Sequence, residues 1–256
     1  MLAGAAVGYA ILYRQFCSKG GKGMLADEVF VSVYGTLGEG LYSGYLSRDK
    51  KQNNVYIVSK SELSGSFPGI VTAVASLSDG TQRMIVSPRN EVMYEPDILF
   101  RLRKLKSLKV EKISCLYEKS CGAVILYRNE KTDELMILMV RNNNGRFYSF
   151  PKGHVEFHEN ERETAIREIK EETNLDVEIL DGFREVSDYC PFGKIRKRVV
   201  FFLAVTRKNN IKIQESEIDS YTWVPLSKAK GACSYDNDCR IIEKVRKYLA
   251  EHKPKI

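Results

Sequence analysis

The chain has 256 residues, enough for one large domain or two small ones, and its composition is that of a globular protein. Its 40 Lys and Arg against 33 Asp and Glu give a net charge of +7, which suits polyanionic partners such as phosphates or nucleic acid. The six Cys include no C-x-x-C pair and there are three His, which argues against a structural zinc site and favours reduced thiols in a cytoplasmic protein.

The chain begins with the apolar segment MLAGAAVGYAILY, which ends at Arg14 and is too short to span a bilayer. It also lacks the positively charged start of a secretory signal. A second Met-Leu pair follows at Met24, where strand-like sequence begins. We therefore interpret residues 1–23 as an N-terminal extension, either a start-site artefact or a short membrane-associating tail, and we expect no membrane span.

Residues 24–96 are rich in short strand-like segments separated by turn residues, which predicts a small barrel or sandwich of β-strands. Residues 97–116 show a different pattern, in which apolar residues recur three or four positions apart between Lys and Arg: Ile98, Leu102, Leu105 and Leu108. This pattern predicts a basic amphipathic linker helix. No aromatic residues alternate with its basic ones, so nucleic acid is not the favoured partner.

Residues 117–256 contain strand-like segments such as CGAVILYR, ELMILMV and KRVVFFLAV, a Glu-rich helix, and a second helix from about Asp236 to Ala250. Strands that enclose two helices predict a layered α/β/α domain with a mixed sheet. The expected fold class is therefore α/β (α+β), with a small β-barrel-like domain before the layered domain.

The Glu-rich helix has a clear start signal, because Asn160 followed by Glu163 forms a capping pair that places its first residue near Glu161. Its apolar residues fall on one face that can pack on a sheet: Ala165, Ile166 and Ile169.

Three acidic residues of this helix, Glu168, Glu171 and Glu172, are neighbours on its surface because helical positions three and four apart adjoin. Their charges repel unless a cation lies among them. Oxygen ligands on a rigid element suit Mg²⁺ or Mn²⁺. The alternative is a solvated helix face held by ion pairs with neighbouring Arg and Lys.

The spacing of Gly153, Glu159, the run from Arg167 to Glu172, and Leu175 resembles the Nudix box, and the resemblance extends over about residues 117–250. It implies a metal-dependent hydrolase of nucleoside diphosphate derivatives, with Glu168, Glu171 and Glu172 as metal ligands and the Lys152 carbonyl as a further ligand. Gly153 would permit a tight loop, and Glu159 would pair with Arg167 to brace it.

One position departs from the family pattern, since Asn174 stands where the family usually has Gly. This position ends the helix and needs a positive φ, which Asn tolerates next best after Gly. We therefore expect a small stability cost without loss of chemistry.

In the implied reaction, Glu171 and Glu172 act through the metal, and a further carboxylate accepts a proton from the attacking water. Glu217, just before a predicted strand, is the candidate base; the alternative is a loop acid without a catalytic role.

Four sequence segments together resemble the asymmetric diadenosine tetraphosphate hydrolases of this family: CGAVI, YSFPKGHVE, KRVVFFLA and YTWVPL. Lys152, His154 and Lys197 would then contact phosphates, and Tyr148 and Tyr189 would stack on adenine. Inositol diphosphates, 5′-phosphorylated RNA and oxidised nucleotides remain alternative substrates. A non-catalytic nucleotide-binding module is the alternative of another class.

Within residues 24–96, the strand order and the segment FPGIVTAVASL resemble the barrel of soluble inorganic pyrophosphatases. Those enzymes need a cluster of acids for their metals, whereas the corresponding stretch RDKKQNNVY keeps only Asp49. We therefore expect the barrel to be non-catalytic.

Overall fold

The computed structural model describes residues 25–46, 54–105, 109–143, 145, 147–191, 193–254 and 256. These residues form two compact units. One unit contains the described residues up to 119 together with 189–197, and the other contains 120–188 and 198–256. The expected extension at residues 1–23 and the stretch around Asp49 lie outside the described residues.

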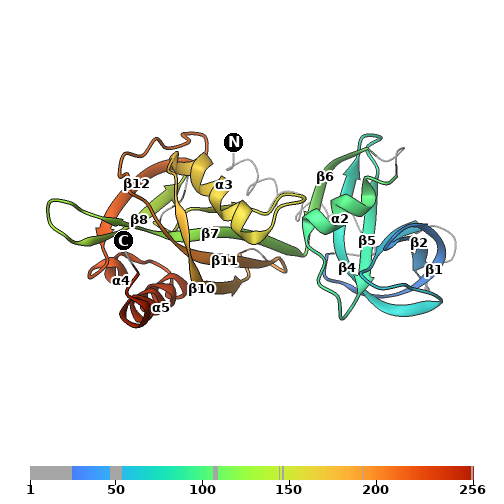
Figure 1. Ribbon diagram of the computed structural model, residues 1–256. Coiled ribbons are helices and arrows are strands. Elements are labelled where there is room, and N and C mark those ends of the chain that lie inside the picture. Colours follow the sequence, from blue (N-terminus) through green and yellow to red (C-terminus); the bar gives the residue numbers. More distant parts are fainter. Residues whose placement is uncertain are drawn as a thin grey trace. The chain divides into compact units, whose positions relative to one another are not determined.

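The first unit is built on five strands that close into a barrel (Figure 1). The strands follow one another around it in the order β1-β2-β3-β5-β4, and β4 returns to β1. The β3–β5 pair is parallel and the other four pairs are antiparallel. The closed sheet confirms the barrel that the short strand-like segments predict. Its strands are β1 (Glu28–Gly38), β2 (Leu41–Leu46), β3 (Asn54–Val58), β4 (Ser66–Leu77) and β5 (Gln82–Pro88).

Apolar side chains of these strands serve two cores, because successive residues of a strand point to opposite faces. One core receives side chains from all five barrel strands, among them Val31, Ile57 and Val86. The other core lies against helix α2 (Glu95–Leu102), which buries Ile98 and Leu102 in it.

The prediction of one linker helix over residues 97–116 is wrong. Helix α2 ends at Leu102, and Val110–Cys115 forms strand β6, which pairs antiparallel with β4. Extended backbone lets Ile113 and Cys115 enter the same core as α2 while their peptide groups pair with β4. Leu108, expected on the helix, lies outside the described residues.

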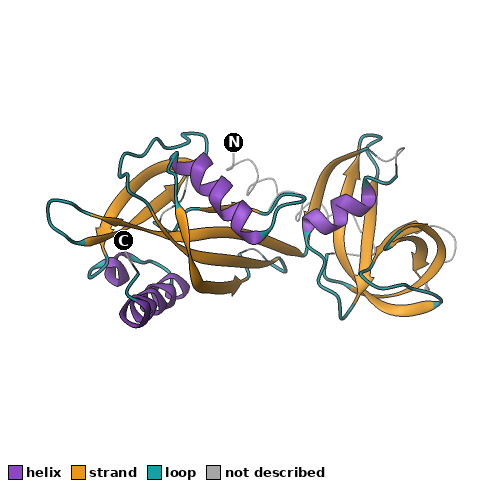
Figure 2. Ribbon diagram, in the orientation of Figure 1, coloured by secondary structure: helices purple, strands orange, loops and turns teal. Residues whose placement is uncertain are grey.

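The second unit contains a five-stranded sheet in the order β10-β11-β7-β8-β12, with the short strand β9 paired to β7 (Figure 2). The β7–β8, β8–β12 and β7–β9 pairs are antiparallel. These strands are β7 (Tyr117–Arg128), β8 (Leu135–Asn142), β9 (Lys152–His154), β10 (Glu178–Tyr189), β11 (Arg196–Val205) and β12 (Ile218–Pro225).

Two helices cover opposite faces of this sheet: α3 (Glu161–Thr173) on one side and α5 (Asp236–His252) on the other, with the short α4 (Ala229–Ala232) before α5 (Figure 1). Strand β7 shows why both faces need cover, since Ala123 packs in the core with α3 and Val124 in the core with α5. The predicted α/β/α layers are confirmed.

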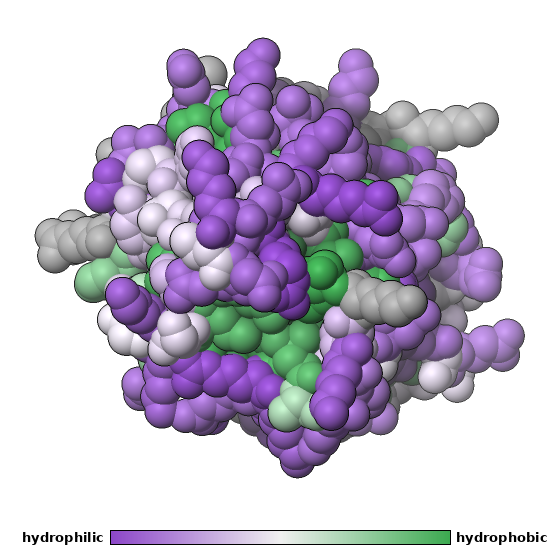
Figure 3. All heavy atoms as spheres, turned by 60° about the vertical axis from the view of Figure 1, so that its left-hand side comes forward, coloured by the Kyte–Doolittle hydropathy of each residue, from purple (hydrophilic) through white to green (hydrophobic). Residues whose placement is uncertain are grey.

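Hydrophilic side chains predominate on the face seen in Figure 3, where they surround an apolar area near its middle. Among the helices of the described residues, none has both the length and the apolar character needed to cross a membrane.

Candidate active site

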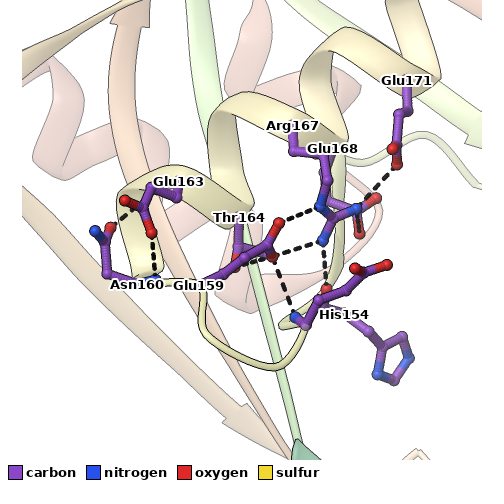
Figure 4. A network of polar contacts seen from close by, with 9 residues as sticks. His154, Glu159, Asn160, Glu163, Thr164, Arg167, Glu168 and Glu171 are labelled. Carbon is purple, nitrogen blue, oxygen red and sulfur yellow. Dashed lines mark hydrogen bonds and ion pairs between the residues drawn. The ribbon is translucent and has the colours of Figure 1, made fainter.

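Helix α3 starts where the sequence predicts, because its first turn is closed by a reciprocal cap (Figure 4). The Asn160 side chain accepts hydrogen bonds from the backbone N–H groups of Arg162 and Glu163 at 2.9 and 3.0 Å. The Glu163 carboxylate in turn accepts one from the Asn160 N–H at 2.8 Å. At the other end, Asn174 has the left-handed conformation, with φ 58°. The cap fixes where the helix begins, and the packing of Ala165 and Ile169 against the sheet fixes which side of it is buried.

The buried face of α3 differs from the predicted one at a single residue. Ala165 and Ile169 are fully buried, but Ile166 is 44% exposed, so the expectation that Ile166 packs on the sheet is wrong. The buried side of the helix also carries polar residues, since Thr164, Glu168 and Glu172 are buried. The helix thus carries two of its carboxylates into the protein.

The Arg167 guanidinium connects the loop before α3 to the carboxylates on the helix (Figure 4). It donates two hydrogen bonds to Glu159, of 2.5 and 2.9 Å, and one to the His154 carbonyl at 2.9 Å. Its Nη1 also lies 2.9 Å from both Glu168 Oε1 and Glu171 Oε2. The ion pair expected between Glu159 and Arg167 is therefore present, and the same guanidinium neutralises two further acids.

Glu159 is held on three sides within this network. Besides Arg167, the Thr164 hydroxyl donates to its Oε2 at 2.8 Å and the Glu156 N–H at 3.1 Å. The Arg167 hydrogen bonds lower the pKa of Glu159 to about 2, with smaller contributions from Thr164 and Glu156. Glu159 is therefore charged at any physiological pH and fixes the loop to the helix.

Position 153 needs glycine because no room is left for a side chain, and not because the backbone turns there. It lies in β9, opposite Cys121 of β7, and a Cβ atom at this position would come within 1.9 Å of the Glu168 carboxyl group. The expectation of a tight loop is thus replaced by a close approach of a strand to a carboxylate. Any side chain at this position would displace Glu168.

Glu172 is the most enclosed acid of the site, with 2% of its surface exposed. Its Oε2 accepts the Lys152 backbone N–H at 3.1 Å. Burial raises the pKa of Glu172 to about 8; the charge of Lys152 opposes this rise, and the charges of Glu168 and Glu217 add to it. Burial likewise raises the pKa of Glu168, although Arg167 opposes the shift.

Glu217 reaches this group from a distant part of the sequence. The segment before β12 follows the end of α3, where Lys212 N–H donates to the Thr173 carbonyl at 3.1 Å and Gln214 N–H to the Glu172 carbonyl at 3.2 Å. The half-buried Glu217 at its end lies close enough for its charge to raise the pKa of both Glu168 and Glu172. Carboxylates from two segments that are distant in the sequence therefore influence one another.

The residues present fit a divalent cation in chemistry, although the side chains are not arranged around one. Within the described ranges, no group of three His, Cys, Asp or Glu side chains surrounds a common point, because Glu168 and Glu171 turn to Arg167. Glu168 and Glu172 nevertheless offer buried oxygen ligands of like charge, which Mg²⁺ and Mn²⁺ prefer. The Glu171 side chain is 51% exposed and can turn from Arg167 to join them.

The residues predicted to contact substrate lie in different surroundings. Tyr148 bonds to the Ser220 hydroxyl at 3.1 Å, and the Arg141 guanidinium lies 5.6 Å from the centre of its ring. The His154 imidazole is exposed and points away from the Arg167 network (Figure 4).

Two other predicted contacts, Tyr189 at the end of β10 and Lys197 at the start of β11, lie in the stretch that is grouped with the first unit. Lys197 Nζ lies 3.6 Å from the Glu118 carboxylate in a largely buried ion pair. Their contact with substrate stays a prediction.

Two buried polar residues are not predicted from the sequence: Thr164, which donates to Glu159 at 2.8 Å, and Asp238 at the start of α5, which accepts from the Ser149 hydroxyl at 3.0 Å. Thr164 carries no motif that distinguishes it from an ordinary helical residue. A buried Asp in the first turn of a helix has a weak signal, because acids are common there for their interaction with the helix dipole.

Residues 118–242 match the family model described as the NUDIX domain. Three mammalian relatives named bis(5′-nucleosyl)-tetraphosphatase [asymmetrical] are similar to the chain. The Sus scrofa protein is 29% identical over 51% of this chain and 95% of its own length. The Mus musculus protein is 35% identical over 43% and 81%, and the Rattus norvegicus protein 30% over 51% and 95%. A solved structure of a C. elegans Ap4A hydrolase binary complex aligns with 52% of this chain and 98% of that one, at 25% identity and a TM-score of 0.48.

Proposed function

Because the chain belongs to the Nudix family and is thus a hydrolase acting on phosphoanhydride bonds, we propose that its substrates are dinucleoside polyphosphates, with diadenosine tetraphosphate cut asymmetrically to ATP and AMP. The substrate is proposed because the chain is similar to three relatives named bis(5′-nucleosyl)-tetraphosphatase [asymmetrical]. In two of them the similarity covers nearly the whole length of the relative.

The group of buried carboxylates supports the chemistry. Glu168, Glu171 and Glu172 would hold Mg²⁺ or Mn²⁺, with the Lys152 carbonyl as a further ligand. The bound metal would supply positive charge to the phosphate oxygens and lower the pKa of a water molecule. Arg167 keeps Glu168 and Glu171 on one side of the site before the metal arrives.

Glu217 would act as the base. Its carboxylate is half-buried near Glu172, so it can accept a proton from water as the water oxygen bonds to phosphorus. Attack on a phosphate next to an adenosine breaks the anhydride bond on its far side. AMP then carries the water oxygen, and ATP leaves with the electron pair of the broken bond.

Cations and rings near the carboxylates support a long, base-bearing substrate. Lys152 and His154 lie on the strand beside Glu172 and offer contacts to a phosphate chain, and Tyr148 offers a ring for stacking. An inositol diphosphate has no base, so such a ring would add nothing to its binding.

A substrate screen tests the proposal. Diadenosine tetraphosphate is compared with an inositol diphosphate, 5′-triphosphorylated RNA and oxidised dGTP, each with Mg²⁺, with Mn²⁺ and with a chelator, and the products are separated by chromatography. We expect ATP and AMP in equal amounts, only with metal, and the isotope of ¹⁸O-water in AMP. Two ADP would contradict the regiochemistry, and a faster reaction of another compound would contradict the substrate. Inactivity on all four would favour a nucleotide-binding module.

The base assignment has a matched control within the same segment. Glu217→Gln should lower kcat by about 10²-fold or more, as expected for loss of a positioned base. Glu215→Gln removes the same charge from an exposed neighbour and should leave kcat within about twofold. Equal kcat values for the two variants would remove Glu217 from the mechanism.

For the barrel of the first unit we propose a non-catalytic role. Full-length protein carrying Glu172→Gln should release no phosphate from inorganic pyrophosphate above a buffer blank. The full chain is needed because residues 189–197 belong to the barrel unit. Metal-dependent release would show that the barrel retains pyrophosphatase activity.

A further inference from the structure

The segment that carries Glu217 is tied to the end of β8 by one residue, Asn143. The Asn143 N–H donates to the Glu217 carbonyl at 2.7 Å, and the Asn143 side-chain amide donates to the Glu215 carbonyl at 2.8 Å. These two carbonyls are two residues apart in the chain. Asn143 therefore holds the backbone of this segment at two points, one of them at Glu217 itself.

The backbone bond of Asn143 continues the pairing of β8 with β12. Asn142, the last residue of β8, is opposite Ile218, the first residue of β12, so Asn143 and Glu217 form the next pair. The side-chain bond is different in kind, because it reaches a carbonyl two residues farther from the strand. Strand pairing alone does not account for it.

The turn after β8 does not need the Asn143 side chain. Its own hydrogen bond runs from the Gly145 N–H to the Asn142 carbonyl at 2.7 Å. An Asn that served only to shape this turn would bond to a backbone group within it. The Asn143 amide instead bonds to a residue 72 positions later, two residues before the proposed base.

Other contacts hold the two ends of the same segment. The Gln214 N–H donates to the Glu172 carbonyl of α3 at 3.2 Å. The Glu217 and Ile218 N–H groups donate to the Gln214 carbonyl at 2.9 and 2.8 Å. Ile218 is 1% exposed and packs in the core that contains the apolar residues of α3. Asn143 thus supplies the hold on the part between two anchored ends.

We propose that Asn143 is a positioning residue for the proposed base: by fixing the Glu215 carbonyl, its side-chain amide keeps the segment in the conformation that directs the Glu217 carboxylate to the attacking water. A base must lie within hydrogen-bond reach of the proton that it accepts, so a looser segment presents a competent base less often. The proposal rests on the proposed role of Glu217 as base.

Asn143→Ala tests the proposal, because it removes the side-chain amide and leaves the backbone bond to Glu217. We expect kcat to fall about 3–10-fold with KM changed less than about twofold, since one hydrogen bond of ordinary strength is lost and the substrate contacts are not. Asn142→Ala removes an equal amide from the preceding residue and should leave kcat within about twofold of wild type.

A double variant separates positioning from a general loss of order. Adding Asn143→Ala to Glu217→Gln should lower kcat by less than about twofold further, because the group that Asn143 positions is already absent. If the full effect of Asn143→Ala recurs in the Glu217→Gln protein, the positioning role is wrong. A rise in KM without a fall in kcat would also overturn it.

The substrate for these rates is whichever compound of the screen the wild-type protein cleaves fastest, so a wrong substrate assignment leaves the test intact. If Glu217→Gln lowers kcat and Asn143→Ala does not, the positioning role fails and the base assignment stands. If neither variant lowers kcat, both fail.

Amide hydrogen exchange followed by mass spectrometry tests the hold on the segment without any substrate. Asn143→Ala should speed exchange several-fold in peptides that contain Glu217 and Ile218, and should leave peptides of β11 unchanged. Unchanged exchange at Glu217 would contradict the proposal. If Asn143→Ala does not fold, Asn143→Ser should give the same results, because its shorter side chain does not reach the Glu215 carbonyl.

Discussion

The two units of the chain each bury carboxylates, but with different neighbours. In the first unit, Glu118 is 8% exposed and lies 3.6 Å from the Lys197 ammonium. In the second unit, Glu168 and Glu172 are 7% and 2% exposed; the charge of Glu168 helps burial to raise the pKa of Glu172, and the charge of Glu217 helps to raise the pKa of both. The first arrangement pairs the acid with a cation between the beginnings of β7 and β11, although the charge of Glu118 also helps burial to raise the pKa of Glu95; in the second, several like charges act on two buried acids.

A buried ion pair offsets part of its desolvation cost by its own attraction. In the second unit, Arg167 beside Glu168 and the charge of Lys152 near Glu172 offset the cost only in part, because the pKa of both acids stays raised. Acids whose pKa stays raised are the candidates for binding a cation, and this is the basis on which the two units can be compared by experiment.

The largest expected effect separates the two acids by activity. Glu172→Gln should lower kcat/KM by about 10³-fold or more, since a metal ligand and its charge are lost. Glu118→Gln should change it less than about threefold. Initial rates with Mg²⁺ measure both, and circular dichroism checks the fold. Near-normal activity of folded Glu172→Gln protein would show that Glu172 is not a metal ligand needed for the reaction.

Glu172→Gln, which should lower activity, should raise the stability of the fold. The pKa of Glu172 lies near 8 in the folded protein and near 4.5 in the unfolded chain. Well below pH 4.5, Glu172 is protonated in both the folded and the unfolded state, so its raised pKa costs no stability. Between pH 4.5 and 8 the unfolded chain releases this proton while the folded protein keeps it, so the free energy of unfolding falls as pH rises. Glu172→Gln should therefore raise the free energy of unfolding by about 2–4 kcal/mol at pH 8 and little at pH 4.5.

Urea unfolding with a chelator at both pH values measures this difference. A gain of the same size at pH 4.5 would show that packing, and not the charge of Glu172, is responsible.

Glu118→Gln should destabilise the protein, because Lys197, with 16% of its side chain exposed, would lose its anion. The free energy of unfolding should fall by about 1–3 kcal/mol at pH 7, less than the full value for a pair that is wholly buried. Opposite signs of the change in unfolding free energy for Glu118→Gln and Glu172→Gln would show that the first acid stabilises the fold and the second destabilises it. A stability gain from Glu118→Gln would place that acid in the same class as Glu172.

The sequence predicts the parts of the site that depend on helix geometry. The spacing of Glu168, Glu171 and Glu172 and the Asn160 cap involve neighbours within a few residues. The position of Glu217 beside Glu172 was predicted only as a role, since it depends on how the segment before β12 follows α3. The Ser149–Asp238 contact depends on packing of α5 and has no local signal.

The fold shows the same division. The barrel and the α/β/α layers follow from strand and helix periodicity, but β6 was missed because Leu102 and Leu105 continue a helical spacing toward it. What makes Val110–Cys115 a strand is its partner β4, which lies far away in the sequence.

Glu159 is an acid of the second unit that is paired with a cation, and its contribution to stability should depend on pH in the opposite direction to that of Glu172. Its pKa of about 2 lies below the ordinary 4.5, so its contribution is complete above pH 4.5 and is lost as pH falls toward 2. Glu159→Gln should lower the free energy of unfolding by about 1–2 kcal/mol at pH 7 and by less at pH 3. Glu156→Gln, an exposed neighbour, is the control. If Glu159→Gln lowers the free energy of unfolding equally at pH 7 and pH 3, the loss comes from altered packing and not from the charge of Glu159.

The smallest change in stability is expected at the end of α3, where a substitution should affect the helix without affecting activity. Asn174 has φ 58° and ψ 17°, a conformation that Gly adopts without the clash of a Cβ atom. Asn174→Gly should raise the free energy of unfolding by about 0.5 kcal/mol, because the greater freedom of Gly in the unfolded chain offsets part of the gain. Asn174→Ala should lower it by about 1 kcal/mol. Neither side chain touches the buried carboxylates, so kcat/KM of both folded variants should stay within about twofold of wild type; a larger change would mean that the end of α3 itself controls where Glu172 lies.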